Sequence, residues 1–415
     1  MLSRRRFMND RIASENGDNL VLQNVKGSKM NTLTIYGHST QDGTPSPENP
    51  VPIVSAGDSG EIEAKVYGGN LISSDISSWN GDGWGAFNDT VLQLSDGIKI
   101  KAINGWAKAC YDTYEMNGKT LNLSFDYRQI ESETTSPTTR QAFAVVVQDE
   151  NIFPSEASDI FPFQIDSPET VKTHVSVSFI ARNYLCLYLR VNTEGQEAGE
   201  TRAIEVTNIM LNAGSTALAF EPYVTPQTLI LSTPGGLPGI PVSSGGNYTD
   251  ENGQQWICDE VDFKRGKYVQ RTMKYTFDGS DKQAWRRYSG GFYIADALED
   301  GEYTRKPGLS NQFFVRSNTE TTLPGLWIGV NNSFLYSVYN EFYDDSLPDF
   351  GLANWKAHLA AHPLEVMTYL ETPIETDLSD EEMAAYKALH TYSPTTTVSN
   401  DAGAWMKVGY REWRR

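Results

Sequence analysis

Apolar and polar residues alternate with a period of two in several short runs of this 415-residue chain. Clear examples are residues 121–127 (LNLSFDY), 175–180 (VSVSFI) and 184–191 (YLCLYLRV). Successive side chains of a strand point to opposite faces, so each run predicts a β-strand with one buried face. The 34 glycines and 19 prolines supply turns between such runs. This pattern predicts a mainly β chain of several domains, built as β-sandwich or jelly-roll modules.

Two short helices near the C-terminus interrupt the β pattern. Leu352, Trp355 and Leu359 fall on one helical face, and Pro363 should end that helix. The second helix should begin at residues 379–382, where a serine and a glutamate have the spacing of a capping box.

Composition and turn signals divide the chain into five segments. Residues 1–30 are too polar to bury much alone, so they should add to another subunit or to a distant sheet. Asn252 and Gly253 predict a hairpin turn, because both residues tolerate a positive φ. The predicted segments are an N-terminal docking arm with a first β segment (1–67), a jelly-roll module (68–225), a β-hairpin segment (226–272), a second sandwich-like domain (273–375) and a C-terminal helix with a tail (376–415).

The charge balance excludes several classes of partner. The chain carries 34 basic and 53 acidic groups, a net charge of −19, which repels the phosphates of nucleic acids and anionic membranes. Its only basic runs, at residues 4–6 and 411–415, are expected to be solvated or to face a partner. We find no apolar run of about 18 residues and no signal-peptide core, so we expect cytoplasmic synthesis without membrane insertion.

The three cysteines, Cys110, Cys186 and Cys258, lie far apart and are odd in number. Their spacing predicts neither a zinc site nor a disulfide framework. We expect Cys186 to pack as a small apolar residue in a reducing compartment.

Two patterns could carry catalysis or a metal. His358 and His362 have i, i+4 spacing, but Leu359 stands where a zincin has its glutamate, so structural histidines are expected. Two acidic clusters (Asp259, Glu260, Asp262; Glu341, Asp344, Asp345) could hold a glycosidase pair.

Glycoside hydrolysis needs two carboxyl groups about 5–10 Å apart across a cleft, one of them desolvated. Neighbouring acids on a strand alternate faces and stay hydrated. We therefore expect no enzymatic activity, no catalytic residue, no cofactor and no metal site.

Sugar binding is the specific chemistry that the sequence favours most. Trp79, Trp84 and Trp106 lie in glycine- and asparagine-rich surroundings typical of loops at a sandwich rim. An indole offers a flat apolar face for a sugar ring and an N–H donor. The alternative, which we favour, is that each indole fills an edge of the sandwich.

Several distinctive blocks together span nearly the whole chain. They are residues 33–53 (LTIYGHSTQDGTPSPENPVPI), 239–266 (GIPVSSGGNYTDENGQQWICDEVDFKRG), 370–379 with 386–392 (LETPIETDLS, YKALHTY) and the opening MLSRRR. These blocks resemble tail and minor structural proteins from phages and prophages of Gram-positive gut bacteria.

Residues 70–223 resemble the carbohydrate-binding-like jelly roll that is often inserted in such tail proteins. The block at 70–72 (NLI) opens this module, and residues 207–223 (TNIMLNAGSTALAFEPY) close it. Related jelly rolls often hold a calcium ion, but no residue here identifies such a site.

The resemblance implies a structural component at the distal end of a phage tail, in the baseplate, tail tip or fibre. Its place would be the virion, its partners other tail subunits, and its state a homo-oligomer, for which we expect a trimer. One alternative is a receptor-binding protein that recognises host cell-surface glycans. The weakest alternative is a glycan depolymerase.

Overall fold

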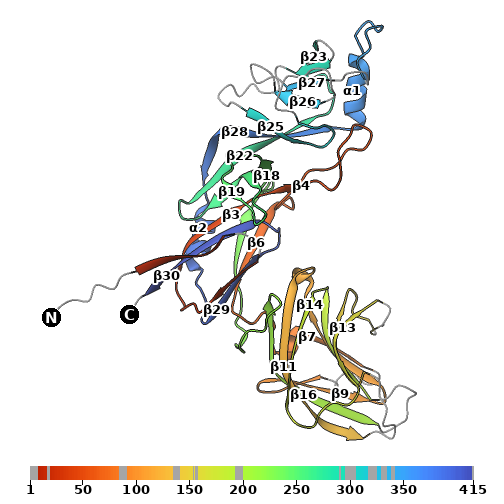
Figure 1. Ribbon diagram of the computed structural model, residues 1–415, viewed down its shortest axis with the longest axis vertical. Helices are drawn as coiled ribbons and strands as arrows, with labels where there is room; N and C mark the ends of the chain where they lie inside the picture. The colour runs from red at the N-terminus through yellow and green to blue at the C-terminus, as the bar shows by residue number, and fades with distance from the viewer. Residues whose placement is uncertain are drawn as a thin grey trace, which may run out of the picture.

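The computed structural model describes residues 8–15, 19–83, 91–133, 141–152, 154, 158–191, 200–288, 291–294, 305–315, 325–328, 334–337 and 342–413. The molecule is elongated, with a β-sandwich at one end, a central body, and a distal region that contains helix α1 (Figure 1). The prediction of a mainly β chain with two short helices near the C-terminus is confirmed. None of the helices in the described ranges has the length and apolarity needed to cross a membrane.

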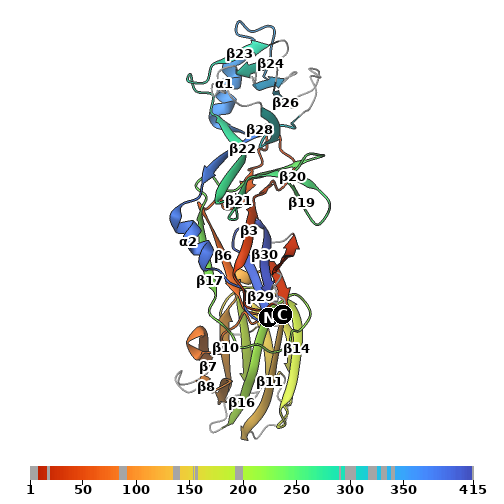
Figure 2. The same cartoon turned by 90° about the vertical axis from the view of Figure 1, so that its left-hand side faces the viewer.

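The sandwich consists of two five-stranded antiparallel sheets, ordered β13-β12-β15-β10-β7 and β14-β11-β16-β9-β8. The two views of the molecule show it as a separate lobe (Figure 2). Its strands are β7 (Trp79–Gly83), β8 (Val91–Gln93), β9 (Gly97–Ile103), β10 (Trp106–Asp112), β11 (Thr120–Glu133), β12 (Phe143–Gln148), β13 (Ile160–Ile165), β14 (Thr173–Ile180), β15 (Tyr184–Arg190) and β16 (Thr201–Ala213).

The apolar residues of the alternating runs form the core of this sandwich. Leu185, Leu187 and Leu189 point inward and join the main cluster between the two sheets. Cys186 and Tyr188 point outward, yet they are also buried, within a second cluster on the outer face of the same sheet. Strand β12 is buried along its whole length because apolar groups cover both of its faces.

The expectation that the chain has no disulfide is wrong. Strands β10 and β15 pair with Cys110 directly opposite Cys186, and the two thiols form a disulfide. The cysteines are 76 residues apart in sequence, so their spacing contains no sign of the strand register that joins them. Cys258 remains a free and buried thiol.

The central body packs a seven-stranded sheet (β1-β30-β3-β21-β22-β28-β25) against a four-stranded sheet (β17-β6-β29-β2). Both contribute to one apolar cluster, which includes Leu33, Ile35, Ile62 and Val398. The strands are β1 (Met8–Glu15), β2 (Asn19–Gln23), β3 (Met30–Tyr36), β6 (Glu61–Tyr67), β17 (Gln227–Ser232), β21 (Glu260–Asp262), β22 (Lys267–Phe277), β25 (Arg305–Ser310), β28 (Leu364–Asp377), β29 (Thr395–Asn400) and β30 (Trp405–Trp413).

Both ends of the chain meet in this body. Strand β1 pairs with β30, with Met8 opposite Trp413, and strand β2 pairs with β29. Of the two destinations expected for residues 1–30, the described part takes the distant sheet of its own chain. The seven-stranded sheet draws strands from four of the five segments predicted as domains.

Both predicted helices are present. Helix α1 (Leu352–Ala361) buries Trp355 and Leu359. Helix α2 (Asp380–Ala388) begins with the predicted capping box between Ser379 and Glu382.

The remaining strands form smaller sheets. The hairpin predicted at Asn252 and Gly253 joins β19 to β20, and Gly253 has a φ of 82°. These strands are β4 (Ser39–Thr40), β5 (Val54–Ser55), β18 (Gly239–Val242), β19 (Tyr248–Thr249), β20 (Gln255–Cys258), β23 (Trp285–Tyr288), β24 (Gly291–Ile294), β26 (Gly325–Ile328) and β27 (Phe334–Ser337).

The sandwich should fold without the rest of the chain. Its main apolar cluster draws all its buried members except Tyr67 from residues 71–211, so excision leaves that core nearly complete. We expect a fragment of residues 68–225 to give a near-UV circular dichroism signal and a cooperative thermal transition. A fragment that shows neither, beside a folded full chain, would contradict a self-sufficient module.

Candidate functional site

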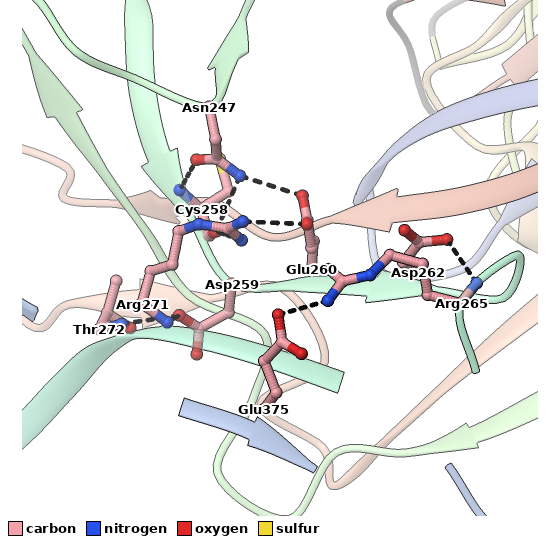
Figure 3. A network of polar contacts seen from close by, with 9 residues as sticks. All are labelled: Asn247, Cys258, Asp259, Glu260, Asp262, Arg265, Arg271, Thr272 and Glu375. Carbon is pink, nitrogen blue, oxygen red and sulfur yellow. Dashed lines mark hydrogen bonds and ion pairs between the residues drawn. The ribbon is translucent and has the colours of Figure 1, made fainter. Parts of the chain in front are cut away.

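The first acidic cluster of the sequence, Asp259, Glu260 and Asp262, lies at strand β21 of the seven-stranded sheet (Figure 3). Asp259 precedes β21 and is 1% exposed. Its Oδ1 accepts the backbone N–H groups of Arg271 (2.7 Å) and Thr272 (2.8 Å), and its Oδ2 accepts the Tyr268 hydroxyl (2.9 Å). Both oxygens of this carboxyl therefore tie β21 to its neighbour β22.

Glu260 faces a different set of partners. It pairs with Arg271 Nη2 at 3.0 Å and accepts Asn247 Nδ2 at 3.1 Å. Asn247 also bonds both backbone polar groups of Cys258, at 2.8 and 3.1 Å. This amide thereby fastens the segment before β19 to the end of β20.

Asp262 shapes the turn between β21 and β22. Its Oδ1 accepts the backbone N–H groups of Lys264 (3.0 Å) and Arg265 (3.2 Å), and Arg265 pairs with Glu375. The acids at 259, 260 and 262 thus have separate structural partners, and their contacts hold the sheet together.

In the second acidic cluster, Asp344 and Asp345 also accept hydrogen bonds from neighbouring residues. Asp344 accepts the backbone N–H of Ser346 at 2.8 Å, and Asp345 accepts the Tyr343 hydroxyl at 2.8 Å. Glu341 lies outside the described residues.

The electrostatics of Asp259 differ from those of its neighbours. Burial raises the pKa of its carboxyl to about 6, although three hydrogen bonds to the charged form oppose this rise. Such a raised pKa is a feature of catalytic acids, but here both carboxyl oxygens already bond to the protein.

The two histidines lie on and just after α1, as the sequence predicted. His358 Nε2 lies 2.8 Å from Gln312 Oε1, and its ring contacts those of Phe342 (4.5 Å) and His362 (5.3 Å). Burial and the neighbouring His362 lower the pKa of His358. Within the described ranges, no group of three or more His, Cys, Asp or Glu side chains could hold a metal ion.

Of the candidate tryptophans, Trp79 and Trp106 lie on opposite faces of one sheet. Trp79 is 6% exposed, lies in the sandwich core and donates its Nε1–H to the carbonyl of Ser73 at 2.7 Å. Trp106 is half-buried on the opposite face of the sheet, 6.2 Å from the ring of Tyr188. Trp84 lies outside the described residues. Trp79 fills the core and presents no free indole face to a sugar.

A groove that the sequence did not predict lies where the sandwich meets the central body. It has a volume of about 670 Å³, and Lys65, Asp112, Tyr114, Glu115 and Tyr223 are among the residues that line it. They come from β6, from the end of β10, from the short 3-10 helix η3 (Tyr114–Met116) and from the segment before β17. No local pattern could reveal this groove, because its walls are 50 to 160 residues apart in sequence.

Comparison with known proteins gives little. No protein-family model matches the chain, and no curated protein matches it. The chain is similar to the tripod (BppUct-A-L) from the baseplate of bacteriophage Tuc2009, with 14% identity over 65% of this chain and 90% of that one and a TM-score of 0.26. It is also matched to the Faustovirus major capsid protein, with 8% identity over 99% and 91% of the two chains and a TM-score of 0.07. TM-scores this low do not indicate a shared fold.

The raised pKa of Asp259 predicts a specific pH dependence of stability. The protonated carboxyl is favoured in the folded state, so its contribution is fully present below about pH 4, the unfolded pKa, and is lost as the pH rises through about 6. The Asp259→Asn variant keeps an oxygen acceptor for both backbone N–H groups and does not titrate.

The measurement is urea unfolding of both proteins between pH 4 and pH 7. The free energy of unfolding of wild type minus that of Asp259→Asn should fall across this range. A difference that stays constant or rises would show that burial does not dominate this carboxyl.

Proposed function

We propose that this protein is a non-enzymatic structural component of a phage tail, placed at the distal end in the baseplate, tail tip or fibre. The observation that carries the proposal is the convergence of the resemblance blocks. Residues 33–53, 239–266 and 370–379 with 386–392 are far apart in sequence but all contribute to the central body and its edge.

The contacts between these blocks are direct. Tyr36 of the first block pairs with Glu260 of the second across β3 and β21. The two blocks also approach each other so closely that a Cβ on Gly239 of the second block would lie 2.5 Å from the carbonyl oxygen of Gly37 in the first. Tyr386 of the third block, in the last turn of α2, stacks on Phe263 of the second block at 4.9 Å. The residues that resemble tail proteins thus act as one structural unit, into which the sandwich is inserted.

Charge supports a docking role for the end of the body that carries β1 and β30. Residues 1–12 hold four arginines and one aspartate, and residues 405–415 hold four basic residues and one glutamate. Strand β1 pairs with β30 from Met8 opposite Trp413 to Glu15 opposite Lys407, so the described parts of the two basic segments lie side by side. On a chain of net charge −19, this end suits an acidic partner surface, such as a neighbouring tail subunit.

The occupied carboxyl groups at 259, 260 and 262 support the non-enzymatic part of the proposal. A glycan depolymerase remains the weakest candidate. A receptor-binding role toward host glycans is the second candidate, and the aromatic and polar groove beside the sandwich favours it.

The experiment for the principal proposal is electron microscopy of intact phage particles with a gold label on the C-terminus. We expect the label at the distal end of the tail. A virion role would be overturned if purified particles carried no label although the labelled protein was present in the lysate. An unlabelled chain serves as the control.

Oligomeric state tests the proposed assembly separately. We expect native mass spectrometry and sedimentation of the full chain to give a trimer, since tail parts follow closed cyclic symmetry. A monomer across the micromolar range, from a chain that is folded by circular dichroism, would contradict the trimer.

A further inference from the structure

The groove between sandwich and body has walls with fixed geometry. Thr113, at the start of η3, donates its backbone N–H to the carbonyl of Asn183 (2.8 Å) and its hydroxyl to that of Arg182 (2.7 Å). The backbone N–H of Tyr114 is bonded to Asp112 Oδ1 at 2.9 Å. This turn therefore needs little ordering when a ligand binds, which favours affinity.

Aromatic rings supply flat apolar surface in the groove. Tyr114 is 69% exposed, an unusual position for a large ring on a fixed turn. Tyr111 and Tyr223 are half-buried and also line the groove. The buried Trp79 contacts the ring of Tyr111 edge-on at 5.4 Å and so fixes its orientation.

Polar groups lie beside these rings. One oxygen of Asp112 accepts the N–H of Tyr114, and the other has no hydrogen-bond partner within the described residues. A free carboxylate oxygen accepts well from a sugar hydroxyl. Rings for the C–H faces and acceptors for the hydroxyls are the two requirements for binding a carbohydrate.

The charges of the groove select among carbohydrates. Lys65 is the one lysine among the described residues that line the groove. It contacts both oxygens of Glu115 (2.6 and 2.8 Å) and also Glu63 (3.1 Å), and these bonds raise its pKa. Together with Asp112, the groove therefore has three carboxylates and one ammonium group, and that ammonium is already paired with two of them. Phosphate- or carboxylate-bearing polymers are repelled from such a site.

We infer that this groove binds a short neutral oligosaccharide through Tyr114 and Asp112. The inference rests on the second candidate under the proposed function, receptor recognition. It places recognition at the junction of two modules, away from the sheet face that carries Trp106. A single site of this kind binds weakly, in roughly the millimolar range, and an oligomer would gain apparent affinity through avidity.

The experiment uses the full chain on an array of neutral and phosphate-bearing bacterial glycans, followed by titration calorimetry with the best neutral oligosaccharide. We expect Tyr114→Ala to weaken binding roughly three- to tenfold and Tyr114→Phe to keep most of it, because the ring supplies the contact. Asp112→Asn should also weaken binding. Phe314→Ala is the matched control, since Phe314 is an exposed ring (62%) that does not line the groove.

The possible outcomes separate the proposed groove site from the proposed receptor role. Loss of binding in Tyr114→Ala but not in Phe314→Ala supports the groove. Equal binding by wild type and Tyr114→Ala overturns the groove and leaves a receptor role to another surface. Binding of phosphate-bearing polymers alone overturns the charge argument and with it this ligand class. No binding by the oligomeric chain removes both the groove and the receptor role, whereas the structural role is judged separately by the labelled particles.

Discussion

The pairing of the two ends of the chain is the interaction on which the rest of the structure depends. Strand β30 lies between β1 and β3, and strand β29 lies between β2 and β6. Without these C-terminal strands, β3 and β6 would each become an edge strand with a row of unpaired backbone N–H and C=O groups. They also contribute Val398, Met406 and Val408 to the core between the two sheets. Every other part is attached to this closed body, the sandwich between β6 and β17 and the distal region beyond β22 and β28 (Figure 1).

Local chemistry could be predicted from the sequence, and pairing between distant residues could not. The alternation at 184–191 and the capping box at Ser379 each depend on residues a few positions apart. The local sequence is therefore enough to predict the strand and the start of the helix. The disulfide and the groove depend on which strands become neighbours. Cys110 meets Cys186, and Lys65 meets Glu115, only after the sheets have formed. The choice of a distant sheet for residues 8–23 also needed a partner strand that lies almost 400 residues later.

The residues singled out for chemistry illustrate the same limit. The sequence suggested tryptophans in glycine-rich surroundings as ligand contacts. Trp79, however, is buried in the core, where its indole N–H donates to a backbone carbonyl. Tyr114 carries no distinguishing motif, yet the turn that holds it leaves its ring open to solvent. In the same way, an acidic cluster of the sequence separates into carboxylates that face different strands and turns. Burial and direction, which a sequence does not state, decide which of these side chains can meet a ligand.

The closure of the body by its last strands also imposes an order in time. The sandwich draws its core from residues 67–211, so it can fold as soon as that stretch has left the ribosome. The central body must wait for β29 and β30, about 170 residues after β17, which at about 5–20 residues per second takes roughly 10–35 s. During that interval β3 and β6 lack the neighbouring strands β30 and β29 that later pair with them. A nascent chain of this kind exposes unpaired strand edges while its sandwich is already folded. Chaperone binding or rapid synthesis of the last strands would limit pairing of these edges with other chains.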